Sequence, residues 1–189
     1  MRFFSPKQPF IPVLALMAAH FALILTLALA KHWSGMSSLS DLGVHDQALW
    51  TFNHLGAPLS TLNAPYETAP RFGWHFSPII LALSPLYWMH LPVESLITVY
   101  CFFITLSAWP LHAALNALNA KAAAPVPVLA WVAVYLFNPL LLNASMWGFR
   151  EVGMALPLLT FALWAVIARR FGMLVLASLL LLLSKEHYG

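Results

Sequence analysis

Apolar runs long enough to cross a membrane are the feature that most constrains this chain. The hydrocarbon core of a bilayer is about 30 Å thick, and a helix needs roughly 20 apolar residues to span it. Four such runs are clear, and a fifth follows them. They cover residues 10–30, 95–118, 126–145, 152–168 and 171–184. The sequence therefore predicts an all-α fold, a polytopic bundle of about five transmembrane helices.

The composition points to the same class of protein. Hydrophobic residues make up 61% of the chain and charged residues 8%, against roughly 45–50% and 25% in soluble domains. A formal net charge of +3 is spread too thinly to form a nucleic-acid footprint, so we expect no nucleic-acid partner. The single cysteine, Cys101, has no partner for an internal disulfide, and we expect it to pack in the interior.

The first apolar run has an alternative interpretation as a signal peptide. Arg2 and Lys7 precede it, and the small residues Ala28 and Ala30 resemble a cleavage site. Signal peptides, however, have apolar segments of only about 7–15 residues. The greater length of this run favours a retained transmembrane helix.

A shorter apolar segment, residues 76–91, decides how the chain is threaded. It contains Pro78 and Pro85 and falls short of the roughly 17–25 residues of a span. If it crossed the membrane, Arg169 and Arg170 would lie opposite the basic N-terminus, against the tendency of cytoplasmic loops to hold Lys and Arg. We therefore predict one re-entrant or short helix here, with a cytoplasmic N-terminus in a bacterial inner membrane.

This threading separates the charged residues by sign. The cytoplasmic set is basic: Arg2, Lys7, Lys121, Arg169 and Arg170. The external set is acidic: Asp41, Asp46, Glu67, Glu151 and Glu186. Three polar segments share the external face, namely residues 31–75, 147–151 and 185–188. No repeat or linker divides the chain, so we predict one transmembrane domain over residues 1–189, the N-terminal part of a longer bundle.

The long external loop contains a predicted amphipathic surface helix. It begins at Ser40 and Asp41, which are good N-cap residues. At 100° per residue one apolar stripe forms, made of Val44, Ala48, Leu49, Phe52 and Leu55. We expect this stripe to sink into the headgroup region of the bilayer and to hold Asp46 and Trp50 at the surface.

The two carboxylates of this helix each have two interpretations. Asp41 is either an N-cap or a functional acid, and Asp46 is either a solvated residue or a functional acid. Residues five positions apart do not face each other on a helix, because only neighbours three or four apart do. Asp41 and Asp46 therefore need not act as a pair.

Other ionisable residues end or begin apolar segments at the same predicted face. His75 precedes the re-entrant segment, and Arg150-Glu151 and Lys185-Glu186 place opposite charges side by side. Charges are common at helix ends, but ionisable residues that converge on one membrane face also mark substrate paths. We predict that four residues surround one external cavity: Asp41, His75, Glu151 and Lys185.

The remaining histidines show no spacing typical of metal ligands. They are His20, His32, His45, His54, His90 and His112. Phosphate-binding loops, nucleophile elbows and kinase motifs are not recognised either. We predict no metal site, and the cofactor stays undetermined, with a divalent cation as the open candidate.

Four motifs together resemble an uncharacterised bacterial multi-pass membrane family, a domain of unknown function. They are Asp-Leu-Gly-Val-His-Asp-Gln-Ala-Leu-Trp from Asp41, His-Phe-Ser-Pro-Ile from His75, Phe-Arg-Glu from Phe149 and Ser-Lys-Glu from Ser184. The layout of a first span, a long external loop with an acidic surface helix and then a bundle also resembles the GT-C class of membrane glycosyltransferases.

The GT-C resemblance implies a site and a substrate. It implies a sugar donor on a polyprenyl phosphate, with membrane lipid as partner. It implies a catalytic base, a carboxylate at Asp41 or failing that Asp46, and donor-phosphate contacts at Arg150 or Lys185. Further substrate-binding candidates are His75, Glu151 and Glu186. Two features depart from that class: position 150 is Arg where His is expected, and members continue through further helices.

Two other classes of function remain open. A transporter or channel subunit would also use ionisable residues and Pro-broken helices. Its site would be expected near the bilayer midplane, where this chain has mainly His20 and His112. A non-catalytic membrane scaffold is the third interpretation.

Overall fold

The computed structural model describes residues 10–62, 69–73, 76–120 and 127–184. Its α-helices are α1 (Phe10–Trp33), α2 (Val44–Leu55), α3 (Ser84–Trp88), α4 (Glu94–Leu106), α5 (Ala108–Asn119), α6 (Val128–Leu136), α7 (Pro139–Ser145), α8 (Val152–Ile167) and α9 (Phe171–Ser184). Shorter turns are the π-helix η1 (Leu39–Gly43) and the 3-10 helices η2 (Arg71–Gly73) and η3 (Pro78–Leu83). The two-residue strands β1 (Leu59–Ser60) and β2 (Ala69–Pro70) pair antiparallel. The predicted all-α fold is thus confirmed in its main elements.

Two helices among the described residues are long and apolar enough to cross a membrane. They are α1, with 24 residues, and the 26-residue helix Glu94–Asn119 that α4 and α5 form together. Helices α6 and α7 would add a third span if they cross together, but they are bent by 47°. Helices α8 and α9 have 16 and 14 residues, fewer than the roughly 20 of a full span. The count of five spans stays a prediction.

The break between α6 and α7 has a local cause at Asn138-Pro139. Pro139 has no amide hydrogen to donate to the preceding turn, and Asn138 before it is extended, with ψ of 130°. The Asn138 side chain then accepts a hydrogen bond from the Leu140 amide at 2.8 Å and so begins α7. One predicted apolar run therefore folds as two helices.

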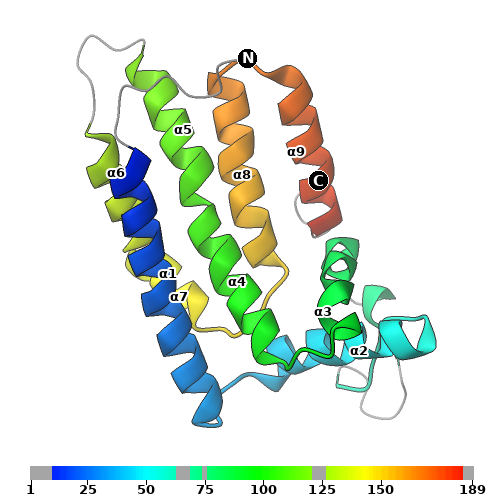
Figure 1. Ribbon diagram of the computed structural model, residues 1–189. Helices are drawn as coiled ribbons and strands as arrows, with labels where there is room; N and C mark the ends of the chain where they lie inside the picture. Colours follow the sequence, from blue (N-terminus) through cyan, green and yellow to red (C-terminus); the bar gives the residue numbers. More distant parts are fainter. Residues whose placement is uncertain (1–9, 63–68, 74–75, 121–126, 185–189) are drawn as a thin grey trace.

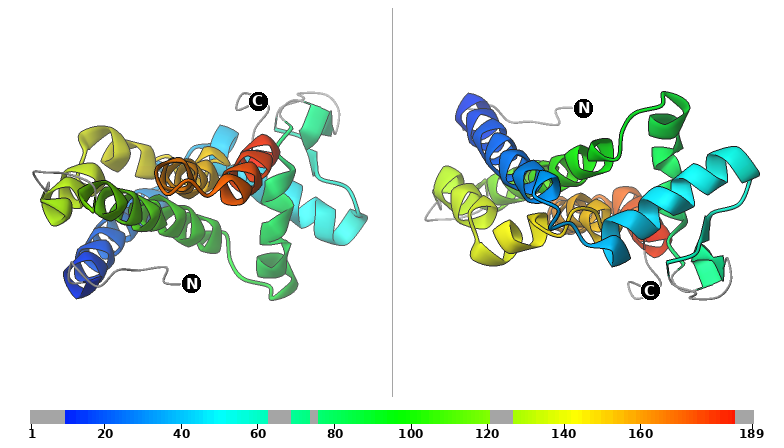
Figure 2. Two further views of the ribbon diagram at one scale, coloured as in Figure 1. Left: turned by 90° about the horizontal axis from the view of Figure 1, so that it is seen from above. Right: turned by 90° about the horizontal axis from the view of Figure 1, so that it is seen from below.

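The long helices stand side by side, and the short elements gather at one end of them (Figure 1). Helix α8 packs against α4, α5 and α9, while α1 packs against α4 and α6. We call the α2 end the end that holds η1, α2, α3, the start of α4 and the connection from α7 to α8. Seen from above and below, α2 and α3 extend to one side of the long helices (Figure 2).

Residues 78–88 form the short helical segment predicted between the first two spans. Helices η3 and α3 together cover Pro78–Trp88, which is too short for a full crossing. The α2 helix before it and the first turn of α4 after it both lie at the α2 end (Figure 1). Which membrane face this end occupies stays a prediction.

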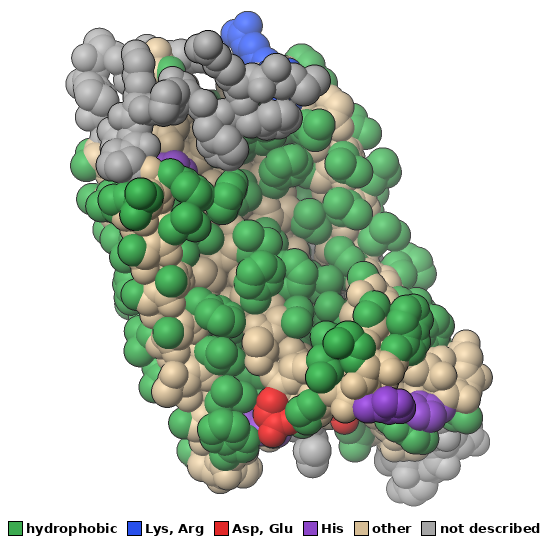
Figure 3. Space-filling model, in the orientation of Figure 1, with side chains coloured by type: hydrophobic (Ala, Val, Ile, Leu, Met, Phe, Trp, Pro, Cys, Tyr) green, Lys and Arg blue, Asp and Glu red, His purple; other side chains and the backbone are tan. Residues whose placement is uncertain are grey.

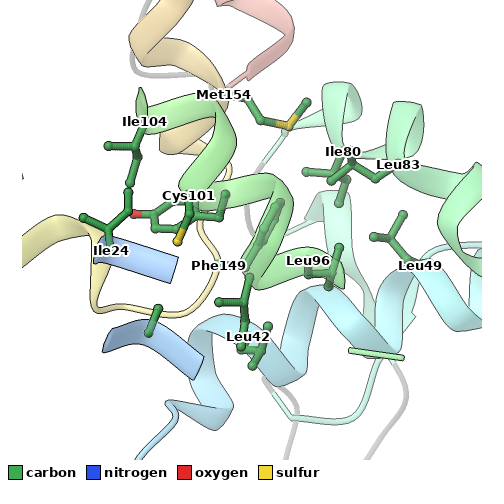
Figure 4. Packing of buried hydrophobic residues seen from close by; sticks show 13 residues of the cluster. Ile24, Leu42, Leu49, Ile80, Leu83, Leu96, Cys101, Ile104, Phe149 and Met154 are labelled. Carbon is green, nitrogen blue, oxygen red and sulfur yellow. The ribbon is translucent and has the colours of Figure 1, made fainter. Parts of the chain in front are cut away.

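The apolar stripe of α2 does not lie on the bilayer, contrary to our prediction. Val44, Ala48 and Leu49 are at most 1% exposed and are covered by protein. Leu49 packs in a cluster with Ile80 of η3 (Figure 4). The stripe is buried because the short segment η3–α3 covers it, and only its last residue, Leu55, is largely exposed.

The main core joins the α2 end to the long helices. Its buried residues are Ile24, Ala28, Leu42, Leu49, Ile80, Leu83, Leu96, Ile97, Tyr100, Cys101, Ile104, Phe149 and Met154. Figure 4 shows that η1, η3, α4 and the connection before α8 all contribute to it. Phe149 is 0% exposed and directly precedes Arg150, so the core fixes the segment that carries this arginine. Cys101 is buried in the same cluster, as expected for a packing residue.

Candidate functional site

The described acidic residues lie at one end of the bundle, together with Lys31 and Arg150, and two further arginines lie at the other end. Within the described ranges the acidic residues are Asp41, Asp46, Glu94 and Glu151, and their elements all lie at the α2 end (Figure 1). Arg169 and Arg170 connect α8 to α9 at the other end. Figure 3 shows Lys and Arg near one end of the surface and Asp and Glu near the other, with His at both ends. This separation matches the predicted one for the residues that the structure describes.

Asp41 and Arg150 form a bidentate ion pair at the α2 end. Arg150 donates from Nε to Asp41 Oδ1 at 2.9 Å and from Nη2 to Oδ2 at 3.1 Å. Such paired, charge-assisted bonds fix both groups in direction as well as distance. The Asp41 side chain is 17% exposed and that of Arg150 is 39% exposed. Asp41 does not cap α2, because this helix follows Gly43 and has no side-chain cap.

The turn before Arg150 holds the guanidinium over an aromatic ring. Trp147 lies beneath it, with 4.1 Å from the arginine Cζ to the ring centroid. Gly148 in this turn has φ of 89°, a conformation that glycine adopts without strain. A Cβ at this position would lie 3.4 Å from Leu42 Cβ, an ordinary contact distance. Lys31 at the end of α1 donates to the Met146 carbonyl at 2.9 Å and so ties this turn to the first helix.

Glu151 does not join Arg150 but pairs with His45. The distance from His45 Nε2 to Glu151 Oε2 is 3.0 Å, and the two side chains are only 3% and 4% exposed. His45 Nδ1 lies 2.6 Å from the backbone carbonyl oxygen of Asp41. The imidazole packs edge-on against Phe149, with ring centroids 5.0 Å apart.

His45 is the site residue that sequence reasoning missed. It follows Asp41 by four positions, the spacing at which residues lie on one face of a helix. That spacing was the available signal. Its partner, Glu151, is 106 positions away and no local pattern connects them.

Asp46 has a different hydrogen-bond partner from the residues of this cluster. Tyr87 of α3 donates its hydroxyl to Asp46 Oδ1 at 2.6 Å, which ties α2 to the short helical segment. The two carboxylates of the surface helix thus have different partners, in line with the prediction that they do not act as a pair. Tyr87 was not predicted, since nothing in the sequence links α3 to α2.

Three predicted site residues lie outside the described residues: His75, Lys185 and Glu186. The structure brings Asp41 and Glu151 to the same end, where they contact Arg150 and His45, and the cavity shared by the four residues stays a prediction. Within the described part of the chain, no group of three or more His, Cys, Asp or Glu is arranged to hold a metal ion.

An apolar groove of about 550 Å³ lies between η3, α4, α5 and α8. Its lining side chains are Ile79, Ala82, Phe103, Leu106, Trp109, Pro110, Met154, Pro157, Leu158 and Phe161. Met154 donates its amide hydrogen to the Glu151 carbonyl at 3.0 Å, so this lining residue lies a single helical turn from Glu151 along the chain.

Long apolar helices, with the described acidic residues at one end and Arg169 and Arg170 at the other, define a helical membrane protein. Residues 31–189 match the family described as predicted membrane protein (DUF2079), and the chain belongs to this family. No curated protein and no solved structure matches the chain. The predicted membership in an uncharacterised membrane family is confirmed, whereas the resemblance to GT-C glycosyltransferases stays a prediction.

Proposed function

We propose that this protein resembles membrane glycosyltransferases in its activity. It transfers a sugar from a polyprenyl-phosphate donor at the α2 end, which faces outward from a bacterial inner membrane. The contact between Asp41 and Arg150 carries the proposal. A carboxylate and a guanidinium from segments 109 positions apart meet at one membrane end, where a lipid phosphate and a polar acceptor would also meet.

The two side chains supply complementary chemistry for this transfer. Asp41 takes the proton of the acceptor hydroxyl as its oxygen bonds to the sugar and the bond from sugar to phosphate breaks. Arg150 offsets the negative charge that remains on the departing lipid phosphate. Glycosyl transfer of this kind needs no oxidant or reductant.

The apolar groove supports a lipid-linked donor in particular. Because the lining residue Met154 lies a helical turn from Glu151, a hydrocarbon chain in the groove with its phosphate at the Met154 side would bring that phosphate toward Arg150. A water-soluble sugar nucleotide would not need such a groove.

Turnover of a labelled polyprenyl-phosphate sugar by the full-length protein in vesicles tests the base role of Asp41. Asp41→Asn keeps the size of the side chain and should lower turnover by about 10²–10⁴-fold, as expected for loss of a general base. Asp46→Asn is the matched control, since it removes the same charge from the same segment but at the Tyr87 contact. Equal turnover in the Asp41 variant and the unaltered protein would leave Asp41 without a catalytic role.

The groove is tested by filling it. Ala82→Trp places a large ring among the lining residues and should weaken use of long-chain donors more than of short-chain analogues. Val134→Trp adds the same ring at a position of α6 that is 60% exposed and should change neither. If both variants had the same effect on the use of long-chain donors, the groove would not be the binding site of the donor.

A transporter or channel subunit is the second candidate, and His20 is the observation that favours it. This side chain is 0% exposed within α1, and its Nδ1 lies 2.9 Å from the Thr105 hydroxyl of α4. Ionisable residues inside membrane helices often mark ion or substrate paths. Substrate uptake into vesicles that is lost in His20→Leu, without any glycosyl transfer, would favour this candidate. A scaffold would show neither activity.

A further inference from the structure

Arg150 is engaged by the very carboxylate that the proposed chemistry needs to be free. Both oxygens of Asp41 accept hydrogen bonds from the guanidinium, one from Nε and one from Nη2. A phosphate that binds the same Nε and Nη2 edge of the guanidinium competes with Asp41 for these two donors, because the fork of N–H groups is planar and fixed. Asp41 and a phosphate would thus compete for the same hydrogen-bond donors of Arg150.

We propose that Arg150 is an exchangeable anion latch: a phosphate group takes the guanidinium from Asp41 and thereby frees the Asp41 carboxylate. The ligand class is a phosphate mono- or diester. The role of the freed carboxylate as a base rests on the proposed function, whereas the exchange of partners does not. Binding of the phosphate-bearing ligand would itself prepare the site for proton transfer.

The surroundings of Arg150 suit such an exchange. Its side chain is 39% exposed, so a ligand reaches it without unfolding the segment. The Trp147 ring lies 4.1 Å from Cζ, and a flat cation can turn over a ring face while it keeps the cation–π contact. Trp147 therefore supports the guanidinium in both positions.

The surroundings of Asp41 hold the backbone still while its side chain is released. His45 Nδ1 lies 2.6 Å from the Asp41 carbonyl oxygen, and His45 is held in turn by Glu151 at 3.0 Å. These contacts involve the backbone carbonyl of Asp41 and not its carboxylate. Loss of the Arg150 contact therefore frees one side chain and leaves η1 attached to the segment before α8.

Phosphate affinity of the purified full chain tests the latch, with inorganic phosphate as the probe and calorimetry as the measurement. Asp41→Asn removes the competing charge and should tighten phosphate binding by about 3–10-fold, whereas Arg150→Gln should abolish it. Asp46→Asn is the control for the loss of one negative charge nearby and should leave the affinity within about 2-fold. Weaker or unchanged binding in Asp41→Asn would overturn the latch, since Asp41 would then position Arg150 and not compete for it.

A second measurement uses the unaltered protein and does not depend on a variant that folds. A water-soluble carbodiimide with an added amine modifies exposed carboxyl groups, and peptide mass spectrometry reports the modified fraction of Asp41. Phosphate should increase modification of Asp41 several-fold and leave that of Asp46 unchanged. Equal modification of Asp41 with and without phosphate would overturn the exchange. If both measurements agree with the latch but no sugar is transferred, the proposed function fails and the latch stands.

Discussion

His45 and Glu151 are 106 positions apart in the chain, yet His45 Nε2 and Glu151 Oε2 lie 3.0 Å apart in the interior. The hydrogen positions follow from the partners. His45 Nδ1 faces the Asp41 carbonyl, which can only accept, so Nδ1 carries a hydrogen. One further proton then lies between Nε2 and Oε2. The contact joins two side chains that are only 3% and 4% exposed.

This pair predicts different effects for two substitutions of Glu151. Glu151→Gln keeps the shape and can donate an amide hydrogen to His45 Nε2, so the free energy of unfolding should change by no more than about 1.5 kcal/mol. Glu151→Ala removes a buried partner of His45 and should cost about 3–5 kcal/mol. Thermal unfolding in detergent compares the two. Similar losses in both variants would contradict the hydrogen-bonded pair.

Gly153 predicts a steric limit between α8 and α4. A methyl group at this position would overlap the Tyr100 ring. The ring is held by a hydrogen bond from the Tyr100 hydroxyl to the Ala144 carbonyl at 3.0 Å. Gly153→Ala should therefore lower the free energy of unfolding by about 1–3 kcal/mol, as overpacking does.

Gly172 of α9 is the matched control for this prediction. No atom lies within 4 Å of a Cβ placed there. Gly172→Ala should leave stability unchanged or raise it by up to about 1 kcal/mol, because alanine forms helices better than glycine. Equal effects at the two glycines would show that α4 and α8 are not in close contact.

Tyr87 predicts how firmly α2 is attached to the short helical segment. Tyr87→Phe removes the donor to Asp46 and should lower stability by about 1.5–3 kcal/mol, as expected for a hydrogen bond to a charged group. Amide hydrogen exchange should become faster in α2 than in α8. A double variant with Asp46→Asn should cost less than the two single variants together, and strict additivity would speak against the contact.

We predict that residues 78–88 do not cross the membrane. A water-soluble reagent should then reach the α2 end from one side of the membrane and the opposite end of the bundle from the other. Leu55 and Met89 are 64% and 67% exposed near the α2 end, and Arg170 is exposed at the other end. Single cysteines at Leu55 and Met89 should react with an impermeant thiol reagent from one side of sealed vesicles. A cysteine at Arg170 should react only from the other side.

The natural cysteine gives the background for this experiment. Cys101 is 0% exposed and should not react in the unaltered protein. Labelling of Leu55→Cys and Met89→Cys from opposite sides would mean that residues 78–88 cross the membrane. The predicted threading would then be wrong.

The sequence by itself determined the helical class and the approximate places of the long helices. Apolar runs at residues 10–30 and 95–118 correspond to α1 and to the continuous helix Glu94–Asn119. This information is local, since a run of apolar side chains needs only its own length to predict a helix in a membrane. The short helix over Pro78–Trp88 was also predictable, because its length and prolines are properties of the segment alone. The break at Pro139 is local in the same sense, because proline disfavours continuation of the helix before it.

Only the tertiary structure decided which side chains meet. Asp41 could have capped α2, and the Arg150 contact that it makes depends on how η1 and the segment before α8 pack against each other. The apolar stripe of α2 would suit a bilayer as well as a protein, and its burial was decided by η3 above it. The partners of these contacts lie on separate elements. Their distance depends on how those elements are rotated and tilted in the packed bundle, which no local pattern of residues encodes.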